Sequence, residues 1–92
     1  MRFEWDEQKN QNNIRKHGFD FADAWKIFAG PMLVDVDDRE EYGETRWIGI
    51  GMIEMRVVVV VYVEINAETT RVISLRKALD YERKAYEASI QN

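Results

Sequence analysis

The chain has 92 residues, of which 46% are hydrophobic and 33% are charged, with a formal net charge of −4. This length and composition predict one folded domain over residues 1–92 and exclude a disordered chain. The longest apolar run, residues 57–63, is far shorter than the roughly 20 residues that cross a bilayer, so no membrane partner is expected.

The first third of the chain predicts a short strand and two helices. Alternating side chains in residues 2–5 indicate an edge strand. Residues 6–18 indicate a polar surface helix, because Asp6 can cap its start and Gly18 can end it after a basic last turn. Residues 20–31 indicate an amphipathic helix. Its apolar stripe consists of Phe21, Ala24, Trp25 and Phe28.

The remaining chain predicts an antiparallel meander and one more helix. Residues 32–38 indicate a strand that leads into an acidic loop, and three further strands follow after tight connections. They are residues 45–53, 56–65 and 71–77. The valine-rich strand is expected at the centre, covered on both faces. The predicted fold class is α+β, with an antiparallel sheet of about four to five strands packed by two N-terminal helices and one C-terminal helix.

His17 is the only histidine, and cations precede it at the end of the first predicted helix. A histidine with an ordinary pKa of about 6.5 can exchange a proton at neutral pH. The neighbouring cations Lys16 and Arg15 would lower that pKa. The side chain could equally complement the C-terminal end of the helix dipole, so both interpretations stay open.

A second group of charged and aromatic side chains spans residues 71–86. Strand alternation places Arg71 and Arg76 on opposite faces of the sheet unless a bulge intervenes. The last predicted helix, residues 78–90, carries Glu82 on its apolar stripe, where a carboxylate needs a cation to stay ionised. The group is therefore either a functional site or an Arg–Glu pair that holds the helix on the sheet.

The acidic residues 35–44 contain carboxylates that would suit a divalent cation. Their spacing does not fit an EF-hand loop, because Glu40 stands where the sixth position needs glycine. We expect a solvated loop and no metal site. Glycine motifs for nucleotides are also missing from the sequence, so no cofactor is expected.

Four spaced motifs carry a family resemblance: F-E-W-D-x-x-K, N-x-x-K-H-G, R-x-I-S-x-R-K-A and E-R-x-x-Y. Together they resemble the BrnT toxins, a branch of the RelE-like ribonuclease toxins, almost from end to end. The resemblance implies a type II toxin that cleaves RNA without a metal and inhibits translation. It also implies a BrnA-type ribbon-helix-helix antitoxin, and contact with operator DNA only through that antitoxin. A cytoplasmic location is expected separately, because no signal peptide is visible in the first residues and the sequence has no cysteine. A hetero-oligomer with the antitoxin is expected, and an edge strand also permits a homodimer.

The resemblance assigns the motif residues to two roles. Those implied in catalysis are Lys16, His17, Arg71, Arg76, Glu82 and Tyr86. Those implied in RNA binding are Lys9, Ser74, Lys77 and Arg83. Asn10 departs from the small apolar residue common in the family, and we expect it to loosen the packing of the first helix.

The charges are distributed unevenly along the chain. Residues 1–19 carry a net charge of +1, residues 20–68 of −7 and residues 69–92 of +2. We expect the basic ends to form a face for RNA or antitoxin and the acidic residues 35–44 to face away from phosphate. Because an acidic chain suits RNA poorly, a second function stays open: a weak or inactive toxin that binds antitoxin and acts only in co-repression.

Overall fold

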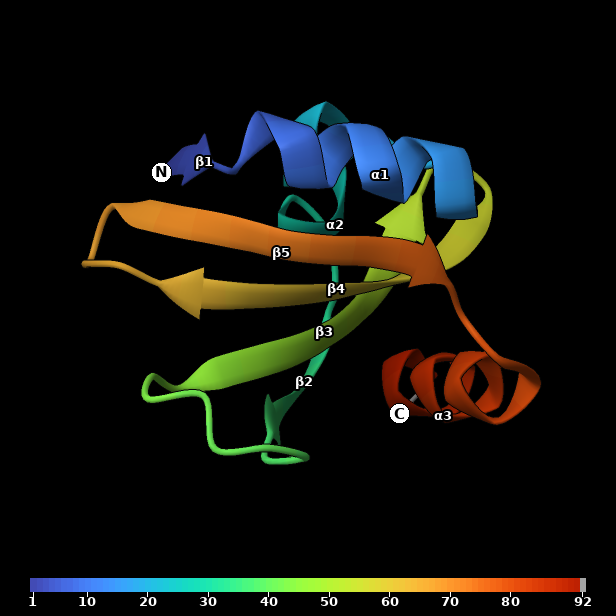
Figure 1. Ribbon diagram of the computed structural model, residues 1–92. Coiled ribbons are helices and arrows are strands. Elements are labelled where there is room, and N and C mark those ends of the chain that lie inside the picture. The colour runs from blue at the N-terminus through green and yellow to red at the C-terminus, as the bar shows by residue number, and fades with distance from the viewer. Residues whose placement is uncertain (92) are drawn as a thin grey trace.

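The computed structural model describes residues 1–91 and contains a five-stranded sheet with helices on both faces (Figure 1). The strands are β1 (Arg2–Glu4), β2 (Leu33–Asp37), β3 (Arg46–Ile53), β4 (Arg56–Glu64) and β5 (Thr69–Lys77). The helices are α1 (Glu7–His17), the 3₁₀ turn η1 (Phe21–Asp23), α2 (Trp25–Phe28) and α3 (Asp80–Ile90). The predicted α+β class is confirmed. None of the described helices is long and apolar enough to cross a membrane.

The order of strands across the sheet is β1-β5-β4-β3-β2, with the valine-rich strand β4 at the centre as predicted. Strands β2 to β5 form the expected antiparallel meander. β1, however, lies at the edge in parallel with β5, so the expectation of a wholly antiparallel sheet was wrong. Alternation of side chains shows that a segment is a strand, but it carries no information on the direction of its neighbour.

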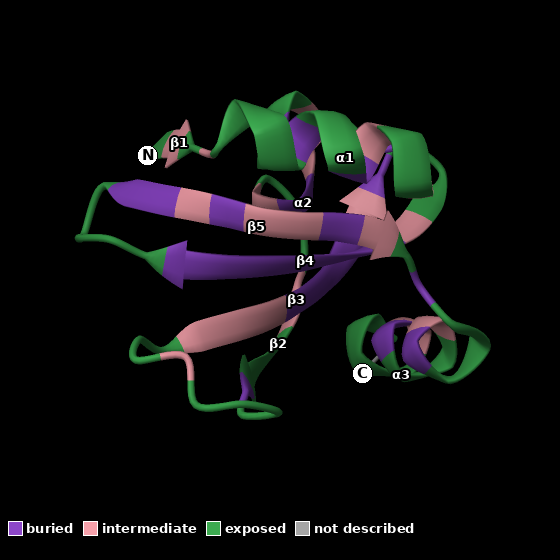
Figure 2. Cartoon of the chain, viewed as in Figure 1, coloured by how far each residue is buried: buried purple, intermediate pink, exposed green. Residues whose placement is uncertain are grey.

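Two apolar cores lie on opposite faces of the sheet. The larger core is closed by η1 and α2 and includes Phe21, Ile27 and Val60. The smaller core lies under α3 and includes Val59 and Tyr86. Figure 2 shows that β4 is buried along most of its length, whereas α1 is largely exposed. Consecutive valines of β4 therefore serve both cores, because successive side chains of a strand point to opposite faces.

The second predicted helix is shorter than expected, because residues 20–31 form a 3₁₀ turn followed by a single α-helical turn. A 3₁₀ turn has fewer residues per turn than an α-helix, so it shifts the apolar stripe. Ile27 is completely buried, while Trp25 is 52% exposed. The predicted core position of Trp25 was therefore wrong.

α1 is attached to the sheet by a buried amide instead of an apolar stripe. The side chain of Asn13 donates to the backbone oxygen of Phe19 at 3.0 Å and accepts the N–H of Leu75 at 3.2 Å. Leu75 lies beyond the residues of β5 that pair with β1, so Asn13 takes the place of a strand partner for this N–H.

Asn10 attaches the following turn to the same helix. Its side chain donates to the carboxylate of Asp20 at 3.0 Å and accepts the N–H of Phe21 at 2.8 Å. It is only 3% exposed. The expectation that Asn10 loosens the packing was therefore wrong, because its amide replaces apolar contact with a set of buried hydrogen bonds.

We expect Asn13→Ala to lower the free energy of unfolding by about 2–4 kcal/mol, because two buried backbone groups lose their hydrogen-bond partner. Urea unfolding measures this change. The matched control is Asn12→Ala on the same helix, where the side chain is exposed. Equal unfolding midpoints for the two variants would show that Asn13 does not attach α1 to the sheet.

Candidate functional site

A bulge in β5 decides which face of the sheet its arginines occupy. The register against β4 shifts between Val61 and Tyr62, which leaves Ile73 as an extra residue in β5. Because the extra residue reverses the alternation beyond it, Arg71 and Arg76 lie on the same face. This is the arrangement that the sequence left open.

A recess of about 600 Å³ lies where the end of α1, the end of β5 and the start of α3 meet. Its lining residues are Lys16, His17, Arg39, Arg76, Lys77, Leu79 and Tyr81, and we refer to them as the basic recess. An adjoining hollow of about 250 Å³ shares Lys16 and His17 and continues along α1 to Lys9 and Ser74. The two basic ends of the chain therefore meet in one surface.

The end of α1 places His17 at this surface. Gly18 has a φ of 78°, a left-handed conformation that favours glycine, and its N–H donates to the oxygen of Ile14 at 2.8 Å. The helix stops there, which leaves His17 in its last turn. The imidazole can thus complement the helix dipole and also face a ligand.

The pKa of His17 lies below its ordinary value of 6.5, first because of partial burial and then because of the charges on Lys16 and Arg76. The sequence suggested Arg15 as the second cation that lowers this pKa, but in the structure that cation is Arg76. The guanidinium of Arg15 instead donates to the side chain of Asn12. The imidazole is therefore mainly neutral at pH 7. In that form it can accept a proton.

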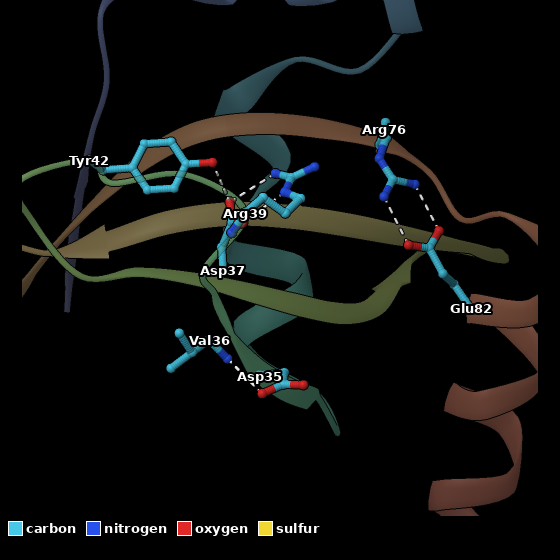
Figure 3. A network of polar contacts seen from close by, with 7 residues as sticks. All are labelled: Asp35, Val36, Asp37, Arg39, Tyr42, Arg76 and Glu82. Carbon is cyan, nitrogen blue, oxygen red and sulfur yellow. Dashed lines mark hydrogen bonds and ion pairs between the residues drawn. The ribbon is translucent and has the colours of Figure 1, made fainter.

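Arg76 forms a bidentate ion pair with Glu82, in which Nη1 and Nη2 each donate to a carboxylate oxygen at 2.8 Å (Figure 3). Glu82 also accepts the N–H of Leu79 at 2.8 Å, which caps the start of α3. Hydrogen bonding within the pair lowers the pKa of Glu82 and raises the pKa of Arg76. The Arg–Glu pair considered from the sequence is thus present. The side chain of Arg76 still remains 31% exposed, so it can also meet a ligand.

Three candidate residues lie outside both the basic recess and the adjoining hollow, and none of the three pairs with a described residue that lines them. Tyr86 is 1% exposed and its hydroxyl donates to the oxygen of Pro31 at 3.1 Å, so its ring packs in the core under α3. Arg71 pairs with Glu4 of β1 at 2.9 Å. Arg83 pairs with Glu87 of its own helix at 3.0 Å. The structure therefore does not bring these three side chains to Lys16 and His17.

Two polar residues of the basic recess had no role assigned from the sequence: Arg39, and Tyr81, which lies within the group of residues 71–86. Arg39 belongs to the acidic loop that was expected to be solvated, and its side chain is indeed exposed, but it also lines the recess. The preceding Asp37 is 3% exposed, and the hydrogen bonds from Arg39 lower its pKa to about 2. The spacing D-x-R-x-x-Y is consistent with this local network around Asp37, but it does not indicate which surface Arg39 lines.

The basic recess combines cations, one imidazole and the exposed phenol ring of Tyr81. Within residues 1–91, no three His, Cys, Asp or Glu side chains are grouped so that they could hold a metal ion. Cations suit a chain of phosphates, and an exposed aromatic ring can stack on an unpaired base. The arrangement therefore fits a single-stranded nucleic acid.

Comparisons with known proteins agree with the resemblance in the sequence. The family model described as "Ribonuclease toxin, BrnT, of type II toxin-antitoxin system" matches residues 5–82. The crystal structure of the Brucella abortus ribonuclease toxin, BrnT, is similar with a TM-score of 0.66 and 33% identity, over 87% of this chain and 99% of that chain. No curated protein matches the sequence. The chain belongs to the BrnT family, the ribonuclease toxins of type II toxin–antitoxin systems.

Proposed function

We propose that this toxin is an endoribonuclease that cleaves RNA in its basic recess without a metal cofactor. The supporting observation is that His17, from the end of α1, and Arg76, from the end of β5, line one recess together with Lys16. Cleavage of RNA without a metal needs a base, an acid and cations that stabilise the transition state. The recess contains groups of all three kinds.

In the proposed reaction, the neutral imidazole of His17 accepts the proton of an RNA 2′-hydroxyl. The 2′ oxygen then bonds to the adjacent phosphorus, and the bond from phosphorus to the 5′ oxygen breaks with its electron pair. Lys16 donates a proton to that 5′ oxygen. The products are a 2′,3′-cyclic phosphate and a 5′-hydroxyl. Arg76 stabilises the negative charge that develops on the phosphoryl oxygens, and Glu82 holds its guanidinium in place.

The RNA path extends along α1 in this proposal. Lys9 and Ser74 line the hollow that adjoins the basic recess, so they bind the strand on one side of the reacting phosphate, and Lys77 binds at the recess itself. Tyr81, which is 70% exposed, stacks on a base. Arg71 and Arg83 contact RNA only beyond the recess, and Tyr86 supports α3 from the core.

We also propose a BrnA-type ribbon-helix-helix antitoxin as the partner, in a hetero-oligomer that covers the basic recess. Membership of a type II family supports an antitoxin partner. The net charge of −4 suits duplex DNA poorly, so operator binding and autoregulation run through the antitoxin. In this proposal, the protein acts in the cytoplasm, where the cleavage of RNA inhibits translation. The α+β architecture is compatible with a RelE-like fold.

One observation favours a second function, in which the protein binds antitoxin and acts only in co-repression. Two nitrogens of the Arg76 guanidinium are already engaged by Glu82, which reduces the positive charge available to RNA. A toxin weakened in this way would keep its fold and its antitoxin surface. The two functions differ in what the protein does when no antitoxin is present.

Expression without antitoxin tests the proposal together with cleavage by the purified protein in excess chelator. We expect growth arrest, fragmented RNA and a 2′,3′-cyclic phosphate at the new 3′ end. Cleavage that depends completely on Mg²⁺ would refute the metal-free mechanism. Normal growth and intact RNA would favour the co-repressor instead.

A further inference from the structure

A polar network in the loop between β2 and β3 has no part in the proposed reaction. Asp37 ends β2, and its side chain is completely inaccessible to solvent. Its carboxylate accepts Nε of Arg39 at 2.7 Å, Nη2 of Arg39 at 2.8 Å and the hydroxyl of Tyr42 at 3.3 Å (Figure 3). It also accepts the backbone N–H of Arg39 at 3.3 Å. One buried carboxylate therefore holds both the backbone and the guanidinium of Arg39.

The network leaves the positive group of Arg39 at the surface. Its side chain is 63% exposed and lines the basic recess together with Arg76 and Lys77. Within the described part of the chain, its hydrogen bonds use the backbone N–H, Nε and Nη2 and leave Nη1 without a partner. A guanidinium held on one edge keeps donors on the other edge for an oxyanion.

The two arginine–carboxylate pairs belong to one face of the sheet. In the register of the sheet, Asp37 of β2 is opposite Arg46 of β3. Arg76 of β5 is opposite Val59 of β4, and Val59 is in turn opposite Ile50 of β3. Arg46 and Ile50 are four positions apart in the same strand, so their side chains point to the same face. The charge of Arg39 acts on the second pair, where it lowers the pKa of Glu82. Figure 3 shows Arg39 held by Asp37 and Arg76 held by Glu82 as two separate pairs.

We propose that Arg39 binds a second RNA phosphate beside the one bound by Arg76, and that Asp37 and Tyr42 are positioning residues for its guanidinium. The inference rests on the proposed RNA site. The strand then runs from the hollow along α1, across Lys16 and Arg76, to the loop between β2 and β3. The buried carboxylate orients the cation before RNA arrives, so that less side-chain freedom is lost on binding.

The test compares Arg39→Gln with the matched control Lys26→Gln. Lys26 lies on α2, pairs with Glu54 and Asp23, and is not part of the basic recess. The probe is a single-stranded RNA with 2′-fluoro sugars, which lacks the attacking hydroxyl, and fluorescence anisotropy measures its binding at several salt concentrations. We expect Arg39→Gln to weaken binding about tenfold, as for loss of a charge-assisted hydrogen bond. The slope of log affinity against log salt should become shallower by about 0.7, whereas Lys26→Gln should change neither quantity.

Cleavage kinetics separate this contact from the reacting phosphate. Arg39→Gln should raise KM about tenfold with kcat nearly unchanged, because the contact exists before and during the reaction. A fall in kcat at constant KM would contradict a separate phosphate site. Equal RNA affinities and salt slopes for Arg39→Gln and Lys26→Gln would overturn the inference.

The positioning role of Asp37 has its own readout. Asp37→Asn keeps the shape of the side chain but not its charge, and should weaken RNA binding by about three- to fivefold, less than removal of Arg39. In the Arg39→Gln background it should add nothing to the loss of affinity. A further loss there would show that Asp37 does not act through Arg39. If wild-type protein binds the 2′-fluoro RNA but does not cleave ordinary RNA in chelator, the proposed reaction fails while the binding inference stands.

Discussion

Replacing His17 with alanine should lower the rate of RNA cleavage by about 10²- to 10⁴-fold, because the reaction loses its general base. Thermal unfolding of the variant should stay close to wild type, since the imidazole is only partly buried at the surface. The matched control is Gln11→Ala, an exposed position of α1 outside the basic recess. Single-turnover cleavage of an RNA oligonucleotide measures the rates. Undiminished cleavage by His17→Ala would show that His17 takes no part in the reaction.

The proposed role of His17 as general base predicts that RNA cleavage depends on pH. A base must be unprotonated, so kcat/KM should rise with pH through the His17 pKa, which lies below 6.5, and then level off. Lys16→Gln removes one of the charges that lower this pKa, so NMR titration should show the pKa of His17 moving up. The folded protein binds the proton less readily than the unfolded chain, so the free energy of unfolding should fall as pH drops below 6.5. A measured pKa above 6.5 would contradict the environment described for His17.

Replacing Arg76 with alanine should affect both cleavage and stability. We expect cleavage to fall by about 10²- to 10³-fold, because the developing phosphoryl charge loses a cation. The free energy of unfolding should fall by about 2 kcal/mol, since the Glu82 side chain, 10% exposed, is left without its partner. Urea unfolding and single-turnover cleavage measure the two effects.

A second substitution separates these two roles of Arg76. Adding Glu82→Gln to Arg76→Ala removes the unpaired carboxylate and should recover part of the stability, but not cleavage. Arg76→Lys keeps the charge without the two-pronged geometry and should retain part of the activity. Recovery of cleavage in the Arg76→Ala, Glu82→Gln protein would show that Arg76 only holds α3 on the sheet.

Local patterns in the sequence were sufficient to predict most of the elements. The valine run predicted the central strand, and the order of charges from Asp6 to Gly18 predicted α1. The carboxylate of Glu82 on an apolar stripe required a cation, and the structure supplies Arg76. These predictions succeeded because each depends on the alternation of side chains, helix termini or the cost of a buried charge.

The candidate site was predictable only in part. Lys16 with His17 and Arg76 with Lys77 were expected from two motifs, and all four line the basic recess. Tyr86 belonged to the same motif as Glu82, yet its hydroxyl is directed to Pro31 inside the protein. A motif places residues in sequence, but burial decides which of its side chains can reach a ligand.

The sequence by itself determined the class of fold, the polar character of α1 and the need of Glu82 for a cation, because these follow from interactions between near neighbours in the chain. Only the tertiary structure decided the parallel pairing of β1 with β5, the bulge at Ile73 and the place of Arg39 beside Arg76. These three features depend on strand register and on contacts between segments far apart in the chain. Strand alternation and local spacing do not specify such contacts, so they leave undetermined that Arg39, an arginine in an acidic loop, lines the basic recess.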